Sequence, residues 1–303
     1  NSKTIQIECQ TLETNSFILR ENLFIDCFKP PIIYLQTPIT NAPVIEGNTF
    51  DNAAFIDGLI FEFKLKESVS SITFKNNTFK NFNIKSQAGG IGFKIENEET
   101  SKDLHLSFDE CYFTSNKQEG AIYCDSNQNK GNTFLTITDC HFHDNQHAEK
   151  GGGAIYANTK HDIAIEKCKF TSNSAEKGAS ICIDPDFEGE TTGSKITISD
   201  CNFNQNTPLK EGTSSIYISS SSNKNLLFEL CTFEDENGGL YIDNFNQDIT
   251  ITTTTFYNVN NGPALYLTET STTININVDG LVFDSCKGNE NKCFYFLRGH
   301  ETV

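Results

Sequence analysis

The sequence predicts an all-β fold: a single-stranded parallel β-helix, or solenoid, of about ten coils in one domain over residues 1–303. Three observations predict it: a phenylalanine recurs every 23 to 34 residues, short apolar strands flank it, and helical periodicity is absent. The ten anchor residues are Phe24, Phe50, Phe79, Phe113, Phe142, Phe170, Phe203, Phe233, Phe256 and Phe283. Stacked at about 4.8 Å per coil, they would form a rod on the order of 50 Å long.

Apolar residues stand at fixed distances before each anchor. In most coils Ile, Leu, Phe or Val lies seven and five residues upstream, as Ile163 and Ile165 do before Phe170. Side chains two residues apart in a strand share a face, so each such pair faces the interior together. The next regular position, two residues before the anchor, carries Cys or Asn. The positions five and two residues before the anchor are three residues apart, so in a straight strand they would lie on opposite faces. A bend in the chain is therefore predicted between these two positions.

A second strand follows each anchor, as in Ile122-Tyr123-Cys124 and Leu240-Tyr241-Ile242, and turns rich in Asn, Gly and Ser separate the strands. A β-propeller blade needs four strands in about 40 residues or more, longer than these periods. A β-sandwich would not keep one residue type at one position through consecutive repeats. Both alternatives are therefore disfavoured.

Composition limits the classes of partner. Asp and Glu number 40 against 23 Lys and Arg, giving a net charge of −17, which excludes nucleic acid and disfavours anionic lipid as ligands. No apolar run is long enough for a transmembrane segment. The chain opens at Asn1 without a charged and apolar leader and has no Met, so we expect a mature or trimmed product. Nothing in the sequence calls for a cofactor.

Two short motifs suggest a family. Gly151-Gly152-Gly153-Ala154-Ile155, followed by Phe170-Thr171-Ser172-Asn173, resembles the paired GGA(I/L/V) and FxxN motifs of the chlamydial polymorphic membrane protein repeat. The likeness covers residues 105–220. It implies a right-handed, pectin-lyase-like β-helix that is secreted or displayed on a cell surface and has an adhesive role.

Two polar columns are expected to be structural. The FxxN asparagines are predicted to close a corner by bonding to backbone and to adjacent coils, and they are Asn116, Asn145, Asn173 and Asn206. The cysteines two residues before the anchors are Cys111, Cys140, Cys168, Cys201 and Cys231. In-register neighbours would lie about 4.8 Å apart, whereas a disulfide needs Cβ atoms near 3.8 Å, so these are predicted to be buried free thiols. The plausible bridges are Cys9–Cys27 and Cys286–Cys293.

One position of the second strand is predominantly tyrosine. Seven of the nine tyrosines occupy it, and they are Tyr34, Tyr123, Tyr156, Tyr217, Tyr241, Tyr266 and Tyr295. Strand alternation points this position outward, which predicts an exposed stripe along one face. In the coil between Tyr156 and Tyr217, Ile181 is assigned to this position. Cys124 and Cys182 are assigned to one common position of the coil. The stripe either only stabilises the stack or offers a surface to a sugar or protein partner.

Two weaker candidates concern metals. His141 and His143 flank an inward phenylalanine and, with Asp144 and His147, could hold a transition metal. Lys169 and Thr171 in the next coil disfavour a cation there. The acidic segment 184–190 could offer oxygen ligands to calcium but fits no twelve-residue calcium loop. No metal site is therefore predicted.

Catalysis is not expected either. A β-helix enzyme acting on polysaccharides needs clustered carboxylates, or a carboxylate–calcium site with an Arg or Lys base. Arg20 and Arg298 lie at opposite ends of the chain, and Lys167 separates Asp139 from Asp200 in one column. A polysaccharide lyase or hydrolase remains the second alternative function.

The expected location is extracellular or at the cell surface. The chain has 33 Asn residues but only one glycosylation sequon, Asn76-Asn77-Thr78, where chance predicts about six. The ends of a β-helix carry unpaired backbone edges, and the last coil, at 293–297, is apolar, which predicts self-association through the ends. The sequence thus favours a non-catalytic adhesive or structural module with a protein or glycan partner on one face. The first alternative is a subunit of an extracellular filament.

Overall fold

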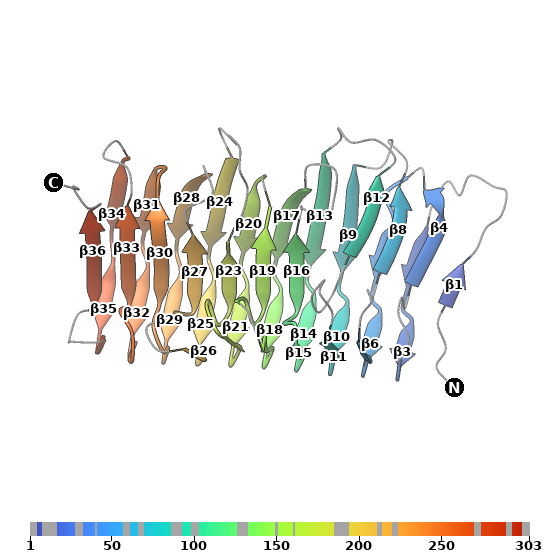
Figure 1. Ribbon diagram of the computed structural model, residues 1–303, viewed down its shortest axis with the longest axis horizontal. Coiled ribbons are helices and arrows are strands. Elements are labelled where there is room, and N and C mark those ends of the chain that lie inside the picture. The colour runs from blue at the N-terminus through green and yellow to red at the C-terminus, as the bar shows by residue number, and fades with distance from the viewer. Residues whose placement is uncertain are drawn as a thin grey trace.

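The chain forms a straight rod of stacked β coils with its two termini at opposite ends (Figure 1). The computed structural model describes residues 5–7, 17–27, 33–39, 41–56, 61–65, 70–85, 93–97, 103–125, 133–148, 151–159, 161–184, 194–210, 214–219, 224–269, 274–288 and 293–298. Within these residues, no helix is long and apolar enough to cross a membrane.

Two ten-stranded parallel sheets run the length of the rod. The upstream sheet contains β2 (Ile18–Arg20), β5 (Val44–Glu46), β9 (Ser71–Lys75), β13 (Leu104–Asp109), β17 (Thr133–Thr138), β20 (Ile163–Glu166), β24 (Ser194–Ser199), β28 (Lys224–Glu229), β31 (Ile249–Thr252) and β34 (Ile276–Asp279). The anchor sheet contains β3 (Leu23–Ile25), β6 (Thr49–Asp51), β10 (Thr78–Lys80), β14 (Tyr112–Thr114), β18 (His141–His143), β21 (Lys169–Thr171), β25 (Asn202–Asn204), β29 (Thr232–Glu234), β32 (Thr255–Tyr257) and β35 (Val282–Asp284).

A third wall closes each coil. From β16 onward it is a seven-stranded sheet, here called the tyrosine sheet, of β16 (Ile122–Asp125), β19 (Ile155–Asn158), β23 (Ile181–Ile183), β27 (Ile216–Ser219), β30 (Leu240–Phe245), β33 (Leu265–Glu269) and β36 (Phe294–Arg298). Nearer the N-terminus a separate four-stranded sheet contains β1 (Ile5–Ile7), β4 (Ile33–Ile39), β8 (Phe61–Leu65) and β12 (Phe93–Asn97). Short strands at the corners are β7 (Ala54–Ile56), β11 (Asn83–Lys85), β15 (Lys117–Gln118), β22 (Ser174–Ala175) and β26 (Thr207–Pro208).

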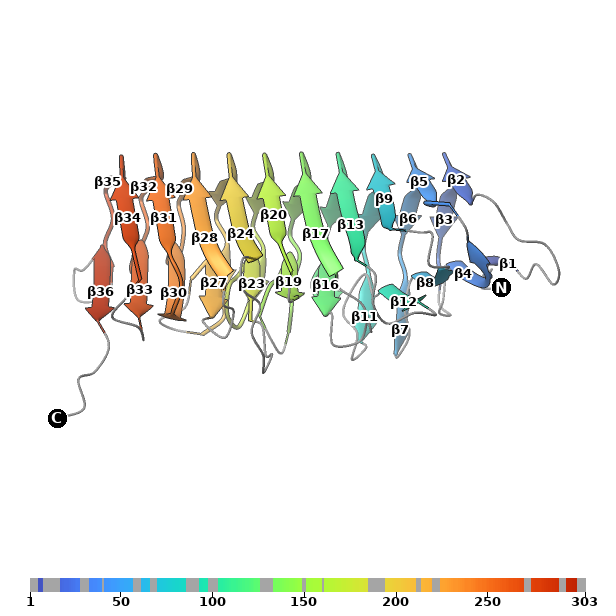
Figure 2. The same cartoon turned by 90° about the horizontal axis from the view of Figure 1, so that it is seen from above.

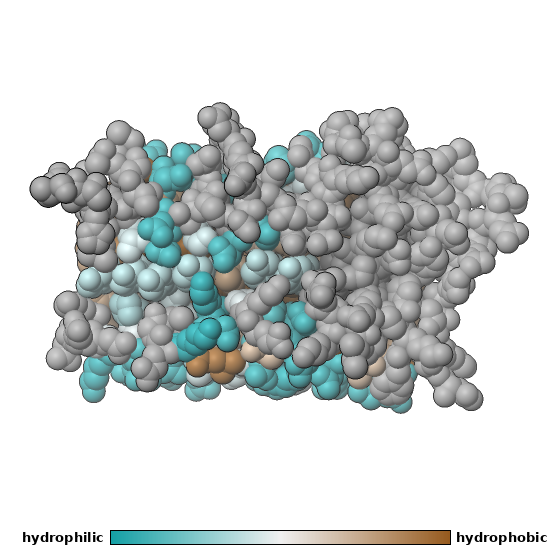
Figure 3. Space-filling model, viewed as in Figure 1, coloured by the Kyte–Doolittle hydropathy of each residue, from teal (hydrophilic) through white to brown (hydrophobic). Residues whose placement is uncertain are grey.

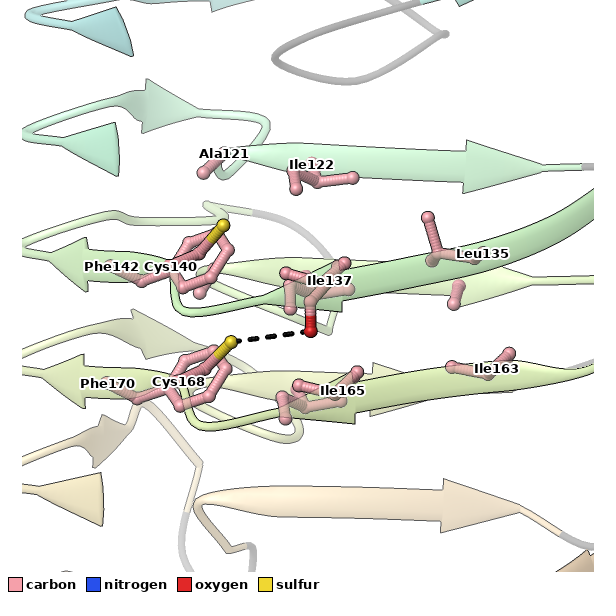
Figure 4. Close-up of a cluster of buried hydrophobic side chains, with 14 of the residues drawn as sticks. Ala121, Ile122, Leu135, Ile137, Cys140, Phe142, Ile163, Ile165, Cys168 and Phe170 are labelled. Carbon is pink, nitrogen blue, oxygen red and sulfur yellow. Dashed lines mark hydrogen bonds between the residues drawn. The ribbon is translucent and has the colours of Figure 1, made fainter. Parts of the chain in front are cut away.

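The anchor phenylalanines lie in register and form the spine of the core. Successive anchor rings stack with centroids 4.6 to 5.1 Å apart. Figure 4 shows Ile137, Cys140 and Phe142 of one coil lying over Ile165, Cys168 and Phe170 of the next. This repetition buries apolar area continuously along the axis. The predicted parallel β-helix is thus confirmed, and the strands that carry the ten anchors form a single sheet.

The bend predicted before each anchor is a residue with a left-handed backbone. It lies three residues upstream of the anchor, and Asn76 (φ 50°), Asp139 (φ 51°) and Lys167 (φ 54°) are examples. A second such residue follows two positions after the anchor, as at Asp144 (φ 52°) and Ser172 (φ 56°). Each reversal turns the chain from one wall to the next, which lets the positions on both sides of it face inward.

Candidate binding face and the corner columns

The tyrosine sheet carries the predicted aromatic column. Its outward position is filled in register by Tyr123, Tyr156, Cys182, Tyr217, Tyr241, Tyr266 and Tyr295. Neighbouring rings stack at centroid distances of 4.8 Å for Tyr123 and Tyr156, 4.1 Å for Tyr241 and Tyr266, and 4.8 Å for Tyr266 and Tyr295. Figure 3 shows pale, mildly hydrophilic residues in a band along this face, over β16–β36.

The expectation of a freely exposed stripe is wrong. Tyr123 and Tyr217 are only 9% and 8% exposed, and Tyr156, Tyr241 and Tyr266 are half-buried. The physical reason is that each ring covers a face of its neighbour, since in-register side chains of parallel strands lie one coil apart. Stacked rings present mainly their edges and hydroxyl groups to a partner.

The column is interrupted at Cys182, where the sequence assigned Ile181 to the outward position. Register pairs Cys182 with Tyr156 on one side and with Tyr217 on the other. Ile181 is wholly buried, so alternation places its neighbour outside. The shared position assigned to Cys124 and Cys182 is also wrong, because Cys124 lies in register with Ala157, which pairs with Ile183.

Backbone and a lysine fill the gap that the missing ring leaves. A β-carbon on Gly151 would collide with the Sγ of Cys182, so only glycine fits here. The Nζ of Lys177 lies 4.9 Å from the centroid of the Tyr217 ring, within reach of a cation–π contact. Cys182 is consequently 1% exposed, and burial raises the pKa of its thiol.

Tyr34 does not belong to this column. It lies in β4, where its backbone pairs with Gln6 of β1 and Glu62 of β8. These strands belong to the four-stranded sheet, separate from the tyrosine sheet. The stripe therefore begins at Tyr123, because the aromatic position is not kept in the coils between.

A polar column that the sequence reasoning missed runs beside the tyrosines, two residues after the outward position in the strands from β16 to β33. Asp243 accepts hydrogen bonds from the Tyr217 hydroxyl at 3.1 Å and from Thr268 Oγ1 at 3.0 Å. Ser219 Oγ donates to Asp184 Oδ1 at 2.5 Å. Burial, followed by the Asp243 carboxylate, raises the pKa of Tyr217, so its hydroxyl remains a donor at neutral pH. The spacing Tyr-x-Asp, Tyr-x-Ser or Tyr-x-Thr was the available signal.

The FxxN asparagines form one continuous hydrogen-bonded ladder in the core. The Nδ2 of Asn116, Asn145 and Asn173 donates to Oδ1 of the next member at 2.8 to 3.0 Å. Each Nδ2 also donates to the carbonyl of an anchor one coil back, as Asn145 does to Phe113 at 3.0 Å. These bonds close the corner in the four consecutive coils that carry the motif, which is the structural role that the motif predicts.

A second column lies two residues before the anchors, where the coils near the N-terminus have asparagine and the following coils have cysteine. Asn77 Nδ2 donates to the carbonyls of Ile45 at 2.8 Å and Lys75 at 3.0 Å. Cys111 Sγ lies 3.3 and 3.4 Å from the equivalent carbonyls, of Phe74 and Asp109. Cys140, Cys168, Cys201 and Cys231 make the same pair of contacts and are at most 2% exposed. A thiol thus substitutes for a carboxamide at this corner.

The predicted terminal disulfides are not found among the described cysteines. Cys27, Cys286 and Cys293 are free thiols, and Cys9 lies outside the described residues. Cys293 Sγ donates instead to the backbone carbonyl of Cys286 at 2.9 Å. Cys286 Sγ contacts the carbonyl of Phe256 at 3.3 Å, because it occupies the FxxN position of its coil. The Cys286–Cys293 bridge is therefore a wrong prediction.

The comparison with known families agrees with this coil geometry. The family model described as right handed beta helix region matches residues 120–299, more than half of the chain. The chain belongs to the right-handed β-helix family. Neither the curated proteins nor the solved structures gave a match.

The histidines considered as metal ligands are dispersed in this β-helix. His141 and His143 lie on the outer wall of β18, and His143 is exposed, whereas His147 is 1% exposed and its Nε2 lies 3.7 Å from a Glu119 carboxylate oxygen. Burial, and then the Lys169 cation, lowers the pKa of His141. Among the described residues, no three metal-binding side chains come together. The acidic segment proposed for calcium lies outside the described residues beyond Asp184.

One buried cation in this β-helix has no sequence signal. Lys224 is 1% exposed, and its Nζ donates to the carbonyls of Thr159 at 2.6 Å and His161 at 2.5 Å. Burial lowers the pKa of its ammonium group to about 8, a change that the nearby Asp162 carboxylate opposes. Lys224 begins β28, and its contacts lie in the turn between β19 and β20, so it ties together coils that are not adjacent.

Proposed function

We propose that this right-handed β-helix is a non-catalytic binding and structural module of a secreted or surface-displayed protein. The tyrosine sheet is its binding face, and the partner is a glycan or a protein recognised through phenol hydroxyls and the polar column. The likeness to surface-displayed chlamydial repeats supports the location. The acidic net charge of −17 favours neutral or basic partners.

One observation carries the proposal: the Tyr217 hydroxyl lies beside the Asp243 carboxylate, on a wall where tyrosine rings stack in register. The Tyr217–Asp243–Thr268 contacts orient a donor and an acceptor before any ligand arrives. Preorganised polar groups reduce the ordering cost of binding, and aromatic edges add contact area that loses little entropy. Ring stacking and the register of the coils hold the polar groups and the aromatic rings in place.

The test separates ligand binding from stacking. Replacing Tyr217, Tyr241 and Tyr266 by Phe keeps the rings and removes their hydroxyls. The probe is a glycan array of neutral, amino and acidic oligosaccharides, together with an array of basic and neutral peptides. We expect binding by the wild-type chain and a loss of at least tenfold in the Phe variant, with a melting temperature lowered by only a few degrees.

A matched control removes hydroxyls from the opposite wall. The changes are Thr136→Val, Thr197→Val and Thr250→Val, at outward positions of the upstream sheet. The control should bind as the wild type does. Equal binding by the Phe variant and the wild type would refute the binding face. Release of reducing ends from the arrayed polysaccharides would refute the non-catalytic assignment and favour a lyase or hydrolase.

A specific observation favours the filament alternative. In the last described coil, core-type side chains are exposed, at 38% for Phe283, 48% for Phe294 and 44% for Phe296. Another coil stacked on them would bury this area and pair the free edges of β34, β35 and β36. Negative-stain microscopy over a concentration series tests it: rods that lengthen with concentration support a filament, and rods of constant length contradict it.

A further inference from the structure

The only N-glycosylation sequon of the chain, Asn76-Asn77-Thr78, lies at a corner between β9 and β10. Asn76 is the left-handed residue of that corner, with φ 50°, and its side chain is exposed. Asn77 is wholly buried and Thr78 is half-buried. Of the two asparagines, Asn76 is therefore both the acceptor of the sequon and the one with an exposed side chain.

The two asparagines differ in the contacts of their side chains. Asn77 donates to the carbonyls of Ile45 and Lys75 and accepts from Asn48, so it supplies the ladder contact. In the part of the chain that the structure describes, the Asn76 carboxamide makes no hydrogen bond; only its backbone N–H is used, donating to Asp109 O at 2.8 Å. A substituent on Asn76 Nδ2 would thus break no contact of the fold.

The neighbouring coils leave room for a bulky substituent. The corner position of the preceding coil is Gly47, which has no side chain. In the following coil it is Glu110, whose carboxylate lies 3.7 Å from Lys75 Nζ and so is drawn toward β9. In the rest of the described corner column, three residues before the anchors, asparagine does not recur.

We propose that Asn76 carries an N-linked oligosaccharide, an inference that rests on the proposed passage of the protein through a secretory pathway. Asn76 Nδ2 forms a bond to the anomeric carbon of the first sugar of a lipid-pyrophosphate-linked oligosaccharide. The bond from that carbon to the pyrophosphate oxygen breaks, the lipid pyrophosphate leaves, and Nδ2 loses one proton. The Thr78 hydroxyl completes the recognition motif while this segment is still unfolded.

The glycan would not cover the binding face. The corner joins the upstream and anchor sheets, along one edge of the rod, and the tyrosine sheet forms the wall away from that edge (Figure 2). A sugar chain on Asn76 would therefore shield the exposed wall near the N-terminal coils and leave the aromatic column accessible.

The experiment is secretion of the full chain from a eukaryotic host, followed by intact mass measurement before and after removal of N-glycans. We expect the added mass of one oligosaccharide on the wild type, and its loss in Asn76→Gln and in Thr78→Ala. Thr78→Ser preserves the motif and should keep the modification. Asn81→Gln changes an exposed left-handed asparagine outside any sequon and should also keep it.

A designed sequon tests whether the host can modify such a corner. Ala54→Thr creates a motif at Asn52, another exposed left-handed asparagine with φ 57°. Modification of Asn52 in that variant together with an unmodified Asn76 would overturn the inference. Binding by the glycan-free Asn76→Gln protein on the arrays described above tests the proposed function separately, so that either idea can fail alone.

Discussion

Glu236 ends the asparagine ladder by accepting both the backbone N–H and the Nδ2 of Asn206 on a single oxygen, at 3.1 and 2.8 Å. It stands three residues after its anchor, where the four preceding coils have asparagine. Its second oxygen contacts the Ser215 hydroxyl, and the residue is 1% exposed. Every amide of the ladder donates in this direction, so the chain of donors finishes on a carboxyl group.

Burial raises the pKa of Glu236 to about 8, although the hydrogen bonds from Ser215 and Asn206 oppose the change. A group whose folded pKa is raised stabilises the fold below its unfolded pKa of 4.5, and that contribution is lost as the pH rises to about 8. Glu236→Gln cannot titrate. We expect its stability relative to the wild type to improve by several kcal/mol between pH 5 and pH 9, since one pKa unit corresponds to about 1.4 kcal/mol.

Urea unfolding of both proteins at the two pH values measures this difference, in which all other titrations cancel. Glu21→Gln, at an exposed corner residue, is the matched control and should shift equally at both pH values. A constant gap between Glu236→Gln and the wild type would show that Glu236 is ionised throughout.

The equivalence of asparagine and cysteine at the second corner can be tested at Asn77. Asn77→Cys should cost about 1 kcal/mol, because a thiol already contacts the equivalent carbonyls at Cys111. Asn77→Ala removes the donor to the Ile45 and Lys75 carbonyls and the acceptor of Asn48 Nδ2, and we expect a loss of about 2–4 kcal/mol. Equal unfolding midpoints for the two variants would show that the contacts at this corner contribute nothing.

The core was predictable because each of its positions repeats. The anchors and the cysteine and asparagine columns recur at fixed offsets, and stacking in register turns a repeated residue into a column. The chain reversal beside each anchor followed from one step of three residues between inward positions. Local spacing therefore sufficed wherever all coils obey one rule.

The binding face was harder because its details depend on contacts between coils. Ring exposure is set by the neighbouring ring, and the gap at Cys182 by the backbone of Gly151, which lies far away in sequence. Lys224 reaches Thr159 across an intervening coil, and no spacing within one period reveals that. These features belong to three-dimensional packing and have no periodic signature.

Restoring the missing ring at position 182 should destabilise the protein. Cys182→Tyr would place a phenol where Gly151 and Lys177 already fill the space, and overpacking of this kind costs about 1–3 kcal/mol. Cys182→Ala removes only the sulfur and should cost about 1 kcal/mol or less. Thermal melts of the two variants compare their stabilities. A higher melting temperature for Cys182→Tyr than for Cys182→Ala would mean that the space beside residue 182 can accommodate a ring.

The buried Lys224 gives a prediction whose sign depends on pH. Its amine donates to the carbonyls of Thr159 and His161 whether charged or neutral, but only the charged form is penalised by burial. A folded pKa of about 8, below the pKa of 10.5 in the unfolded chain, means that stability rises as the pH increases from about 8 toward 10.5.

Lys224→Met removes both hydrogen bonds at every pH, and at pH 7 it also relieves the cost of a buried charge. The two effects oppose each other at pH 7, whereas at pH 10 the loss of donors acts alone. We therefore expect the variant to lie further below the wild type at pH 10 than at pH 7, by about 2–3 kcal/mol. Lys195→Met, at an exposed position of β24, should show no such change in urea unfolding. An equal deficit at both pH values would mean that burial does not disfavour the charged amine, and that the two carbonyls compensate fully for lost hydration.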